Sequence, residues 1–360
     1  MSNRNNTPSD YTGFFTRRSF LKRQLGSFAS LAAMSAGRKL GVSQEATPPL
    51  GQGDFRYRVV PNWGVLGTAT PVAHCHGIAC TRSDQIILLT THTANNVIVY
   101  DTRGKLLHKW GTTFPGAHGL SLVEENGREV LFITDLNRHL VVKTSLTGET
   151  LEEWHWPKES GKYPSEKDFR PSWTLHPEGG GFFVLDGYGL DYISHYGEDG
   201  KLLKTFGGKE GGIVHWGPHG GMVDRPKNGV ESLLIAMSDQ QHLLRLSFAG
   251  DHLMEVPLPG GNPRQIRRFG SHYFVAHLAD NWPKNRNSRG FVSILDEHLR
   301  VVSNIGGSPP WYSDEGKLLP MKNTDPAFIH PHDLTVDAEG SLYVAQFQSG
   351  NTYPVKLERI

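Results

Sequence analysis

Three histidines have the residue type and the spacing to form a metal site. They occur in similar short segments, Ala117-His118-Gly119, Pro218-His219-Gly220 and Pro331-His332-Asp333, which long stretches of chain separate. Neutral imidazole is the commonest protein ligand for metals, and three protein ligands with an open fourth position are typical of catalytic zinc. For any single histidine, the simpler interpretation is a turn residue that bonds to a backbone carbonyl. The set of three predicts zinc only if the fold brings them together.

The elements that must position these histidines belong to a unit that recurs from about residue 60 onward. Each copy has a turn, an apolar strand, a polar turn, two further strands, and Gly-Lys or Gly-Glu before a last strand. The clearest copy runs from His76 through Ile86–Leu89 and Val97–Tyr100 to Trp110. Five more copies begin near Ala117, Pro171, Pro218, Pro263 and Pro331.

Repeats of this length with four short strands each indicate the blades of a β-propeller. We therefore predict an all-β fold in which residues 60–360 form six blades closed into one ring. A β-sandwich is the alternative all-β fold, but its strands would not recur in the same internal order. The 41 glycines of the chain fit a propeller, because every blade needs several tight turns.

In a propeller, the three histidines would lie near the same point on the channel axis. The first strand of each blade lines the central channel, so residues at its start face the axis. His118, His219 and His332 begin the second, fourth and sixth blades, and alternate blades of a six-bladed ring lie about 120° apart. Their convergence predicts an open zinc site on the channel axis. His76 begins the first blade in the same way and is either a fourth ligand or a residue that supports the other three.

The blade-opening segments also carry a resemblance to a known family. Pro331–Leu334 together with Gly340–Val344 resembles the last blade of the peptidyl-α-hydroxyglycine α-amidating lyase propeller, which is related to NHL-repeat propellers. The likeness extends in chain order through Ala117–Leu122, Val184–Tyr188 and Pro218–Gly220.

This resemblance implies a set of residue roles and a reaction. It implies that His118, His219 and His332 are zinc ligands, with Tyr188 taking the proton from the substrate hydroxyl. It also implies that Asp333 is linked to a structural calcium. The implied reaction converts a peptidyl-α-hydroxyglycine to a peptide amide and glyoxylate in the central channel, with zinc polarising the substrate hydroxyl.

Two arginines of that family's active site have no counterpart here. The matching stretches, Leu88–Thr93 and Ala236–Asp239, contain no arginine. Arg264 and Arg267 in the fifth blade could approach the channel from another side, and the insert Asp280–Arg289 could form a loop over its rim. A guanidinium matters for this reaction because it would hold the substrate carboxylate and stabilise developing charge.

Two other function classes stay open at this point. The first is a non-catalytic NHL-type propeller that binds a protein or glycan partner on one rim. The second is a lactonase-like propeller enzyme that uses calcium, but calcium would want acidic and amide ligands on the axis, where histidines prevail. The blade-opening histidines favour the metal-dependent enzyme, and the missing arginines favour the binding protein.

The N-terminal segment reads as an export signal. Arg17 and Arg18 are followed by Phe20-Leu21-Lys22 and a mildly apolar run, Leu25–Ala36, which resembles a twin-arginine signal peptide. We expect a signal at residues 1–36, a linker at 37–59, and a periplasmic or secreted propeller that first meets the twin-arginine export machinery. A basic amphipathic helix on a cytoplasmic protein is the alternative.

Composition sets the remaining limits. The formal net charge is +1, and residues 1–46 hold seven basic and two acidic residues, so the rest of the chain is slightly acidic. No general attraction to nucleic acid is expected from this balance. The sequence also has no uncharged apolar stretch long enough to predict a stable membrane span.

Overall fold

The computed structural model describes residues 48–208, 217–226, 229–347 and 352–360. The expected twin-arginine signal at 1–36 and the first part of the expected linker lie outside these residues. By its internal contacts, the chain from Thr47 to Ile360 forms one compact unit. No helix among the described residues has the length and apolar character needed to cross a membrane.

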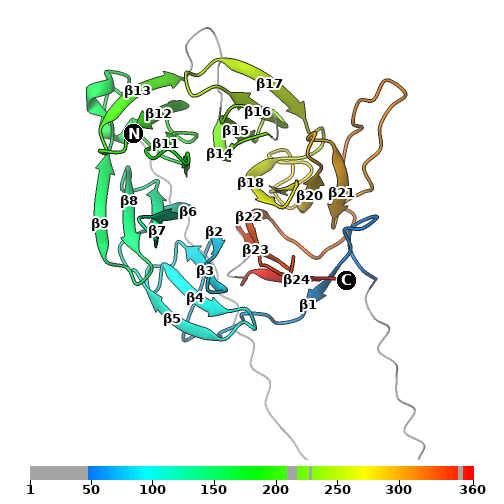
Figure 1. Cartoon of the computed structure of the whole chain (residues 1–360). Coiled ribbons are helices and arrows are strands. Elements are labelled where there is room, and N and C mark those ends of the chain that lie inside the picture. Colours follow the sequence, from blue (N-terminus) through cyan, green and yellow to red (C-terminus); the bar gives the residue numbers. More distant parts are fainter. Residues whose placement is uncertain (1–47, 209–216, 227–228, 348–351) are drawn as a thin grey trace, which may run out of the picture. The chain divides into compact units, whose positions relative to one another are not determined.

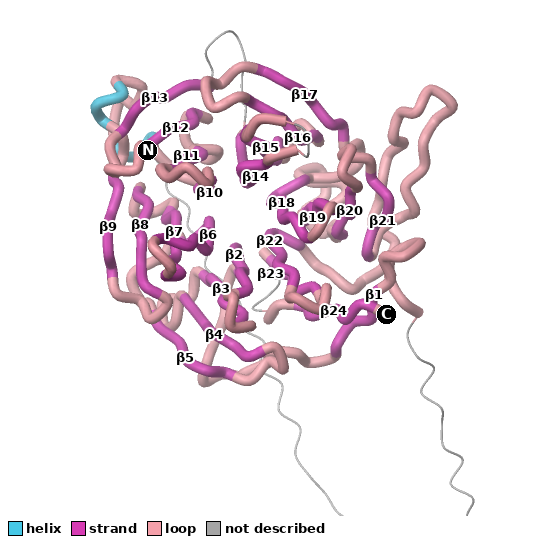
Figure 2. Tube along the Cα trace, in the orientation of Figure 1, coloured by secondary structure: helices cyan, strands magenta, loops and turns pink. Residues whose placement is uncertain are grey.

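Within the described residues, six four-stranded antiparallel sheets surround a common axis (Figure 1). This arrangement confirms the predicted all-β, six-bladed propeller. Nearly all of the regular structure is strand, as Figure 2 shows. Two 3-10 helices, η1 (Lys158–Ser160) and η2 (Glu166–Asp168), lie between the second and third sheets.

The blades follow one another along the chain. The first sheet contains β2 (Cys75–Cys80), β3 (Gln85–Thr90), β4 (Val97–Asp101) and β5 (Leu106–Trp110). The second contains β6 (Ala117–Glu125), β7 (Arg128–Asp135), β8 (Leu140–Ser145) and β9 (Thr150–His155). The third contains β10 (Trp173–Leu175), β11 (Phe182–Leu185), β12 (Tyr192–Tyr196) and β13 (Leu202–Gly207).

The second half repeats the pattern. The fourth sheet contains β14 (Pro218–Asp224), β15 (Ser232–Met237), β16 (His242–Leu246) and β17 (His252–Pro257). The fifth contains β18 (Pro263–Phe269), β19 (His272–His277), β20 (Phe291–Leu295) and β21 (Val301–Ile305). The sixth contains β22 (Pro331–Val336), β23 (Leu342–Gln346), β24 (Val355–Arg359) and β1 (Tyr57–Val60).

The sixth sheet closes the ring because it joins both ends of the propeller. β1 pairs with β24 in antiparallel register, with Tyr57 opposite Arg359 and Val60 opposite Lys356. The propeller therefore extends at least to Tyr57, three residues before the boundary expected at residue 60. Leu50 forms a further bridge with Tyr57.

Burial follows the position of each strand within its blade. The second strand of the first blade, Ile86–Leu89, is fully buried because both of its faces pack against neighbouring blades. The outer strand β5 alternates between half-buried and exposed residues, as expected for a strand with one solvated face. The hydrophobic core is thus divided into clusters that lie between adjacent blades, such as the one shared by β3, β4, β6 and β7.

Aromatic residues near the blade ends link each blade to the next. Trp110 at the end of the first blade donates from Nε1 to the Leu146 carbonyl of the second, at 3.0 Å. Gly148 packs on the same indole with φ +92°, and a Cβ there would lie 2.6 Å from the ring. Trp154 repeats the bond to the Gly200 carbonyl of the third blade, at 3.0 Å. The recurring aromatic residues at the blade ends therefore pack between blades.

Candidate metal centre

A β-bulge at the start of five of the six inner strands, β10 being the exception, aims one side chain at the axis. In β14 the pairing passes from Pro218 to Gly220, so His219 has no partner on β15. His332 in β22 and His76 in β2 are skipped in the same way, and the shift in β6 leaves His118 unpaired. Bulges re-aim side chains next to functional sites. Here the bulges orient four imidazole side chains toward one end of the channel.

The next blade fixes the orientation of three of these rings. His118 Nδ1 lies 2.8 Å from the Ser172 carbonyl, and His219 Nδ1 lies 2.9 Å from the Arg264 carbonyl. His332 Nδ1 lies 2.7 Å from the His76 carbonyl. A carbonyl can only accept, so each Nδ1 carries the proton and donates it. Each neutral ring is therefore left with an Nε2 lone pair, as in metal-ligating histidines whose other nitrogen bonds to a carbonyl.

Burial keeps these rings neutral. It lowers the pKa of His118 to about 3, with the Arg264 guanidinium acting in the same direction. Burial also holds the pKa of His219 and His332 well below the ordinary value, and neighbouring imidazoles and Arg264 add to the effect. All three are at most 3% exposed. Deprotonated nitrogen is the form that binds a metal.

Tyr188 lies between two of the lone pairs. Its hydroxyl is 3.0 Å from His219 Nε2 and 3.3 Å from His118 Nε2. A neutral phenol has one proton to donate, so it can satisfy only one of these two acceptors. More lone pairs than protons at a buried site call for a cation. The all-nitrogen donor set fits zinc or a similar transition metal.

A tight turn holds Tyr188 in this position. Both oxygens of the buried Asp186 accept backbone N–H groups, from Arg170 at 2.6 Å and from Leu190 at 2.8 Å. Burial raises the pKa of Asp186 to about 7. Gly187 passes so close to the neighbouring blade that a Cβ would lie 2.1 Å from the Pro218 carbonyl oxygen. The sequence Asp186-Gly187-Tyr188 therefore encodes the position of the phenol as well as its identity.

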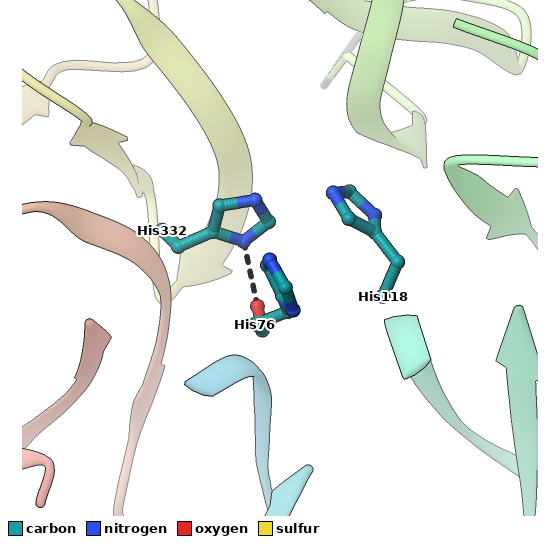
Figure 3. A group of neighbouring side chains, drawn as sticks. All are labelled: His76, His118 and His332. Carbon is teal, nitrogen blue, oxygen red and sulfur yellow. Dashed lines mark hydrogen bonds between the residues drawn. The ribbon is translucent and has the colours of Figure 1, made fainter. Parts of the chain in front are cut away.

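The rings form two triangles that share an edge. The ring centroids of His118, His219 and His332 are 4.8 to 4.9 Å apart, so the structure brings together the three predicted ligands. His76 lies 4.7 Å from both His118 and His332. Figure 3 shows this second group, whose possible ligand atoms all lie within 4.8 Å of one another. The candidate centre thus contains all four blade-opening histidines.

A cavity of about 350 Å³ opens over this centre. Arg264 lies in its wall, 7% exposed, and its Nε has no hydrogen-bond partner among the described residues. From the insert 280–289, Arg286 stacks on Trp282 with its guanidinium 4.9 Å from the ring centroid. The lining includes Tyr188, His219, Ser238, Asp239, Arg264, Leu278, Trp282, Arg286, His332 and Phe347. The insert therefore contributes to the rim, as the sequence suggested, and Arg264 supplies a guanidinium from the fifth blade.

Arg267 does not enter this cavity, because it fills the axis beyond the histidines. Its Nε and Nη2 donate to the two oxygens of Asp333, at 3.0 and 2.7 Å. Nη2 also reaches the Leu120 carbonyl of the second blade at 3.2 Å, and the guanidinium lies 5.6 Å from the Trp173 ring centroid. The backbone N–H groups of Ile78 and Leu334 donate to the same carboxylate.

These contacts do not fit the structural calcium that the resemblance implied for Asp333. Both carboxylate oxygens already accept two hydrogen bonds each, and a guanidinium occupies the position in which a cation would balance the charge. Calcium needs six to eight oxygen ligands, whereas this place offers a cationic side chain. The sequence could not show this, because Arg267 and Asp333 come from different blades.

The chain matches no protein-family model and no curated protein sequence. Solved structures do match. A streptogramin B lyase is 16% identical with a TM-score of 0.54, over 81% of this chain and 95% of that one. A catalytically inactive virginiamycin B lyase from Staphylococcus aureus, solved with quinupristin, is 13% identical with a TM-score of 0.52, over 86% and 100%. A Bacteroides thetaiotaomicron protein of unknown function is 9% identical with a TM-score of 0.53, over 81% and 70%. The protein therefore shares the propeller fold of these structures.

Proposed function

We propose that the protein is an exported, metal-dependent propeller enzyme of the lyase type. The observation that carries this proposal is the set of buried imidazoles whose Nδ1–H groups are bound by carbonyls. The Nε2 lone pairs of two of them, His118 and His219, meet the single hydroxyl of Tyr188. Zinc is the proposed metal, with His118, His219 and His332 as ligands. When bound, it supplies Lewis-acid chemistry that polarises a hydroxyl or carbonyl oxygen of the substrate.

Tyr188 is the residue that holds and moves a proton. Its ring reaches the cavity opening, and the residue is 37% exposed, while its hydroxyl points inward to the histidines. Burial of the hydroxyl raises the pKa of Tyr188, and Arg264 opposes that rise. The phenol is therefore protonated at neutral pH before substrate arrives. It has to pass its own proton to an acceptor before it can take one from a substrate hydroxyl.

The proposed reaction is the cleavage of a peptidyl-α-hydroxyglycine or a related adduct. The hydroxyl loses its proton, the bond between carbon and amide nitrogen breaks, and the nitrogen gains a proton. The products are a peptide amide and glyoxylate. Arg264, buried and beside Tyr188, is placed to bind the carboxylate of such a substrate. It offers this guanidinium from the fifth blade, whereas the resembled family uses the first and fourth.

The likeness to two lyases supports the proposal in one respect. At 13% and 16% identity it concerns the fold alone, and the same fold carries lyase activity in those proteins by their names. The NHL-type resemblance adds the zinc-ligand roles and the reaction.

Export forms a separate part of the proposal. The twin-arginine resemblance of residues 1–36, followed by a linker, indicates a propeller that folds before it is transported to the periplasm or beyond. Replacing Arg17 and Arg18 together by lysine should retain the protein in the cytoplasm. Undiminished periplasmic accumulation of that variant would contradict the assignment.

The main experiment is metal analysis of protein purified from cells, followed by an activity assay. We expect close to one transition-metal ion per chain, and release of glyoxylate when a hydroxyglycine peptide is added. Purified protein without near-stoichiometric metal, together with no effect of His219→Ala on metal content, would overturn the proposal. Metal without glyoxylate release would leave the centre intact but exclude this substrate. Absence of both would favour a propeller that binds a protein or glycan partner.

A further inference from the structure

His76 occupies the same structural position as the three expected ligands. Each lies on the bulge of an inner strand, and the equivalent positions of the third and fifth blades are Ser172 and Arg264. His76 also takes part in the arrangement that orients the others, because its carbonyl accepts the proton of His332 Nδ1. Four of the six positions around the axis therefore present an imidazole.

The distances place His76 beside two of the three expected ligands. Its ring centroid is 4.7 Å from His118 and 4.7 Å from His332, as close as the expected ligands are to one another. Figure 3 shows the three rings turned toward one another, with the dashed bond from His332 to the backbone of His76. A metal that is bound by His118 and His332 would thus have the His76 ring within its immediate surroundings.

The residues that the structure describes satisfy the His76 ring only in part. The residue is 6% exposed, and its Nδ1 is buried with no well-formed hydrogen bond to a described residue. Its ring neighbours are His74 at 5.9 Å, Phe347 at 5.2 Å, and the two histidines already named. The charged group that acts on it is Arg264, a cation. Among the described residues, the backbone of Ala117 is within hydrogen-bonding reach of this ring, and no carboxylate acts on it. A buried imidazole satisfied to this extent is costly unless something else binds its remaining lone pair.

We propose that His76 is a fourth metal ligand, so that imidazoles from the first, second, fourth and sixth blades bind one ion. This inference rests on the metal site of the proposed function and extends it. Four neutral nitrogen donors select divalent transition metals such as zinc, copper or nickel, and disfavour calcium and magnesium, which prefer oxygen. The centre then keeps the full positive charge of the ion, next to Arg264.

The test uses the full chain, stripped of metal and titrated with Co²⁺, Zn²⁺ and Cu²⁺. His76→Gln removes the ring and keeps the backbone carbonyl that orients His332. His74→Gln is the matched control, since it removes a neighbouring ring from the residue directly before β2. We expect His76→Gln to weaken Co²⁺ binding by more than about 100-fold, beyond the 10–100-fold typical of residues that only orient ligands. It should also change the visible spectrum of bound Co²⁺. His74→Gln should leave both unchanged.

A second measurement needs no variant and covers the case in which His76→Gln does not fold. Pulsed EPR of the Cu²⁺-loaded native protein counts the imidazoles bound to copper, and we expect four. Three coupled imidazoles, or a His76→Gln protein with the native affinity and Co²⁺ spectrum, would overturn the fourth ligand while leaving the three-histidine site in place. Native protein that binds none of these metals would overturn the site itself.

Discussion

The two ends of the central channel are built from the same inner strands, but they differ in whether their buried polar groups have hydrogen-bond partners. Toward the start of these strands, the Nε2 lone pairs of His118 and His219 share the one phenolic proton of Tyr188, and among the described residues Arg264 Nε has no hydrogen-bond partner. Farther along, the hydrogen bonds of Asp333 are all made, by Arg267 and by backbone groups, and the pair contacts backbone groups of two other blades, the first and the second. His332 and Asp333 are adjacent in sequence and belong to different regions.

This difference separates a binding site from a structural contact. A buried charge pair whose hydrogen bonds are all made has no capacity for a ligand, and breaking it costs stability. A set of acceptors without enough donors costs stability as it stands, which agrees with the proposal that a metal binds there. Mutations at the two ends should therefore affect different quantities.

The largest effect is expected at the histidine end. His219→Ala should weaken zinc binding by at least 100-fold and abolish metal-dependent activity, because it removes a ligand and its bond to the Arg264 carbonyl. The melting temperature of the metal-free protein should change little. Equilibrium dialysis and thermal melts check both. His155→Ala, on an exposed outer strand, is the control, and equal metal loss in that variant would contradict the assignment.

Removal of the phenolic proton should give the next largest effect. Tyr188→Phe keeps the ring and its packing but cannot move a proton, so kcat should fall by about 10²–10⁴-fold. Its zinc content should stay at the native level. Steady-state kinetics with parallel metal analysis tests this, and a Tyr188→Phe enzyme with native kcat would remove Tyr188 from the reaction.

At the other end, the expected loss is one of stability. Arg267→Met leaves Asp333 buried without its cation and should lower the free energy of unfolding by about 3–5 kcal/mol. Metal affinity of the folded protein should be close to native. Arg268→Met is the matched control. Its partner Asp224 keeps Arg245 at 2.7 Å and Tyr273 at 2.9 Å, so we expect a smaller loss. Chemical denaturation measures both, and equal losses would contradict the special role of Arg267.

The smallest effect concerns acid. His176 lines the opening near Arg267, packs 4.4 Å from the Phe132 ring, and burial lowers its pKa to about 3. The unfolded chain binds this proton near pH 6.5, so the contribution is complete above that pH and is lost as the pH falls toward 3. The slope is about 1.4 kcal/mol per pH unit. His176→Phe should reduce the acid sensitivity of unfolding by that amount, and an unchanged pH profile would refute it.

The sequence predicted the parts of this structure that depend on local patterns. Repeated strands and turns indicated six blades, and the alternating positions of His118, His219 and His332 indicated that they would meet. The bulges were not predictable, because they lie at the first residues of their strands, before an alternating pattern has begun. Without knowledge of the bulges, the sequence could place His76 near the site but could not give its distance from the other histidines or its contacts.

Contacts across the ring account for the rest. Arg264 and Arg267 are three residues apart on β18, and sequence alone could not tell which one faces the cavity. In the structure, Arg264 lies beside Tyr188 and His219, whereas the Arg267 side chain lies on the opposite side of the histidines. For the same reason the sequence could not show that Asp333 does not fit the expected calcium, since the guanidinium beside its carboxylate comes from another blade.

The closure of the ring by β1 and β24 has a consequence for biosynthesis. The proposed ligands are spread from the first blade to the sixth, so a ribosome must synthesise nearly the whole propeller before the last of these histidines emerges. His332 then reaches its final position only when the sixth sheet forms, which joins β24 to β1. If the proposed centre binds metal, metal content would therefore report completed assembly, and a truncated or misfolded propeller would bind none.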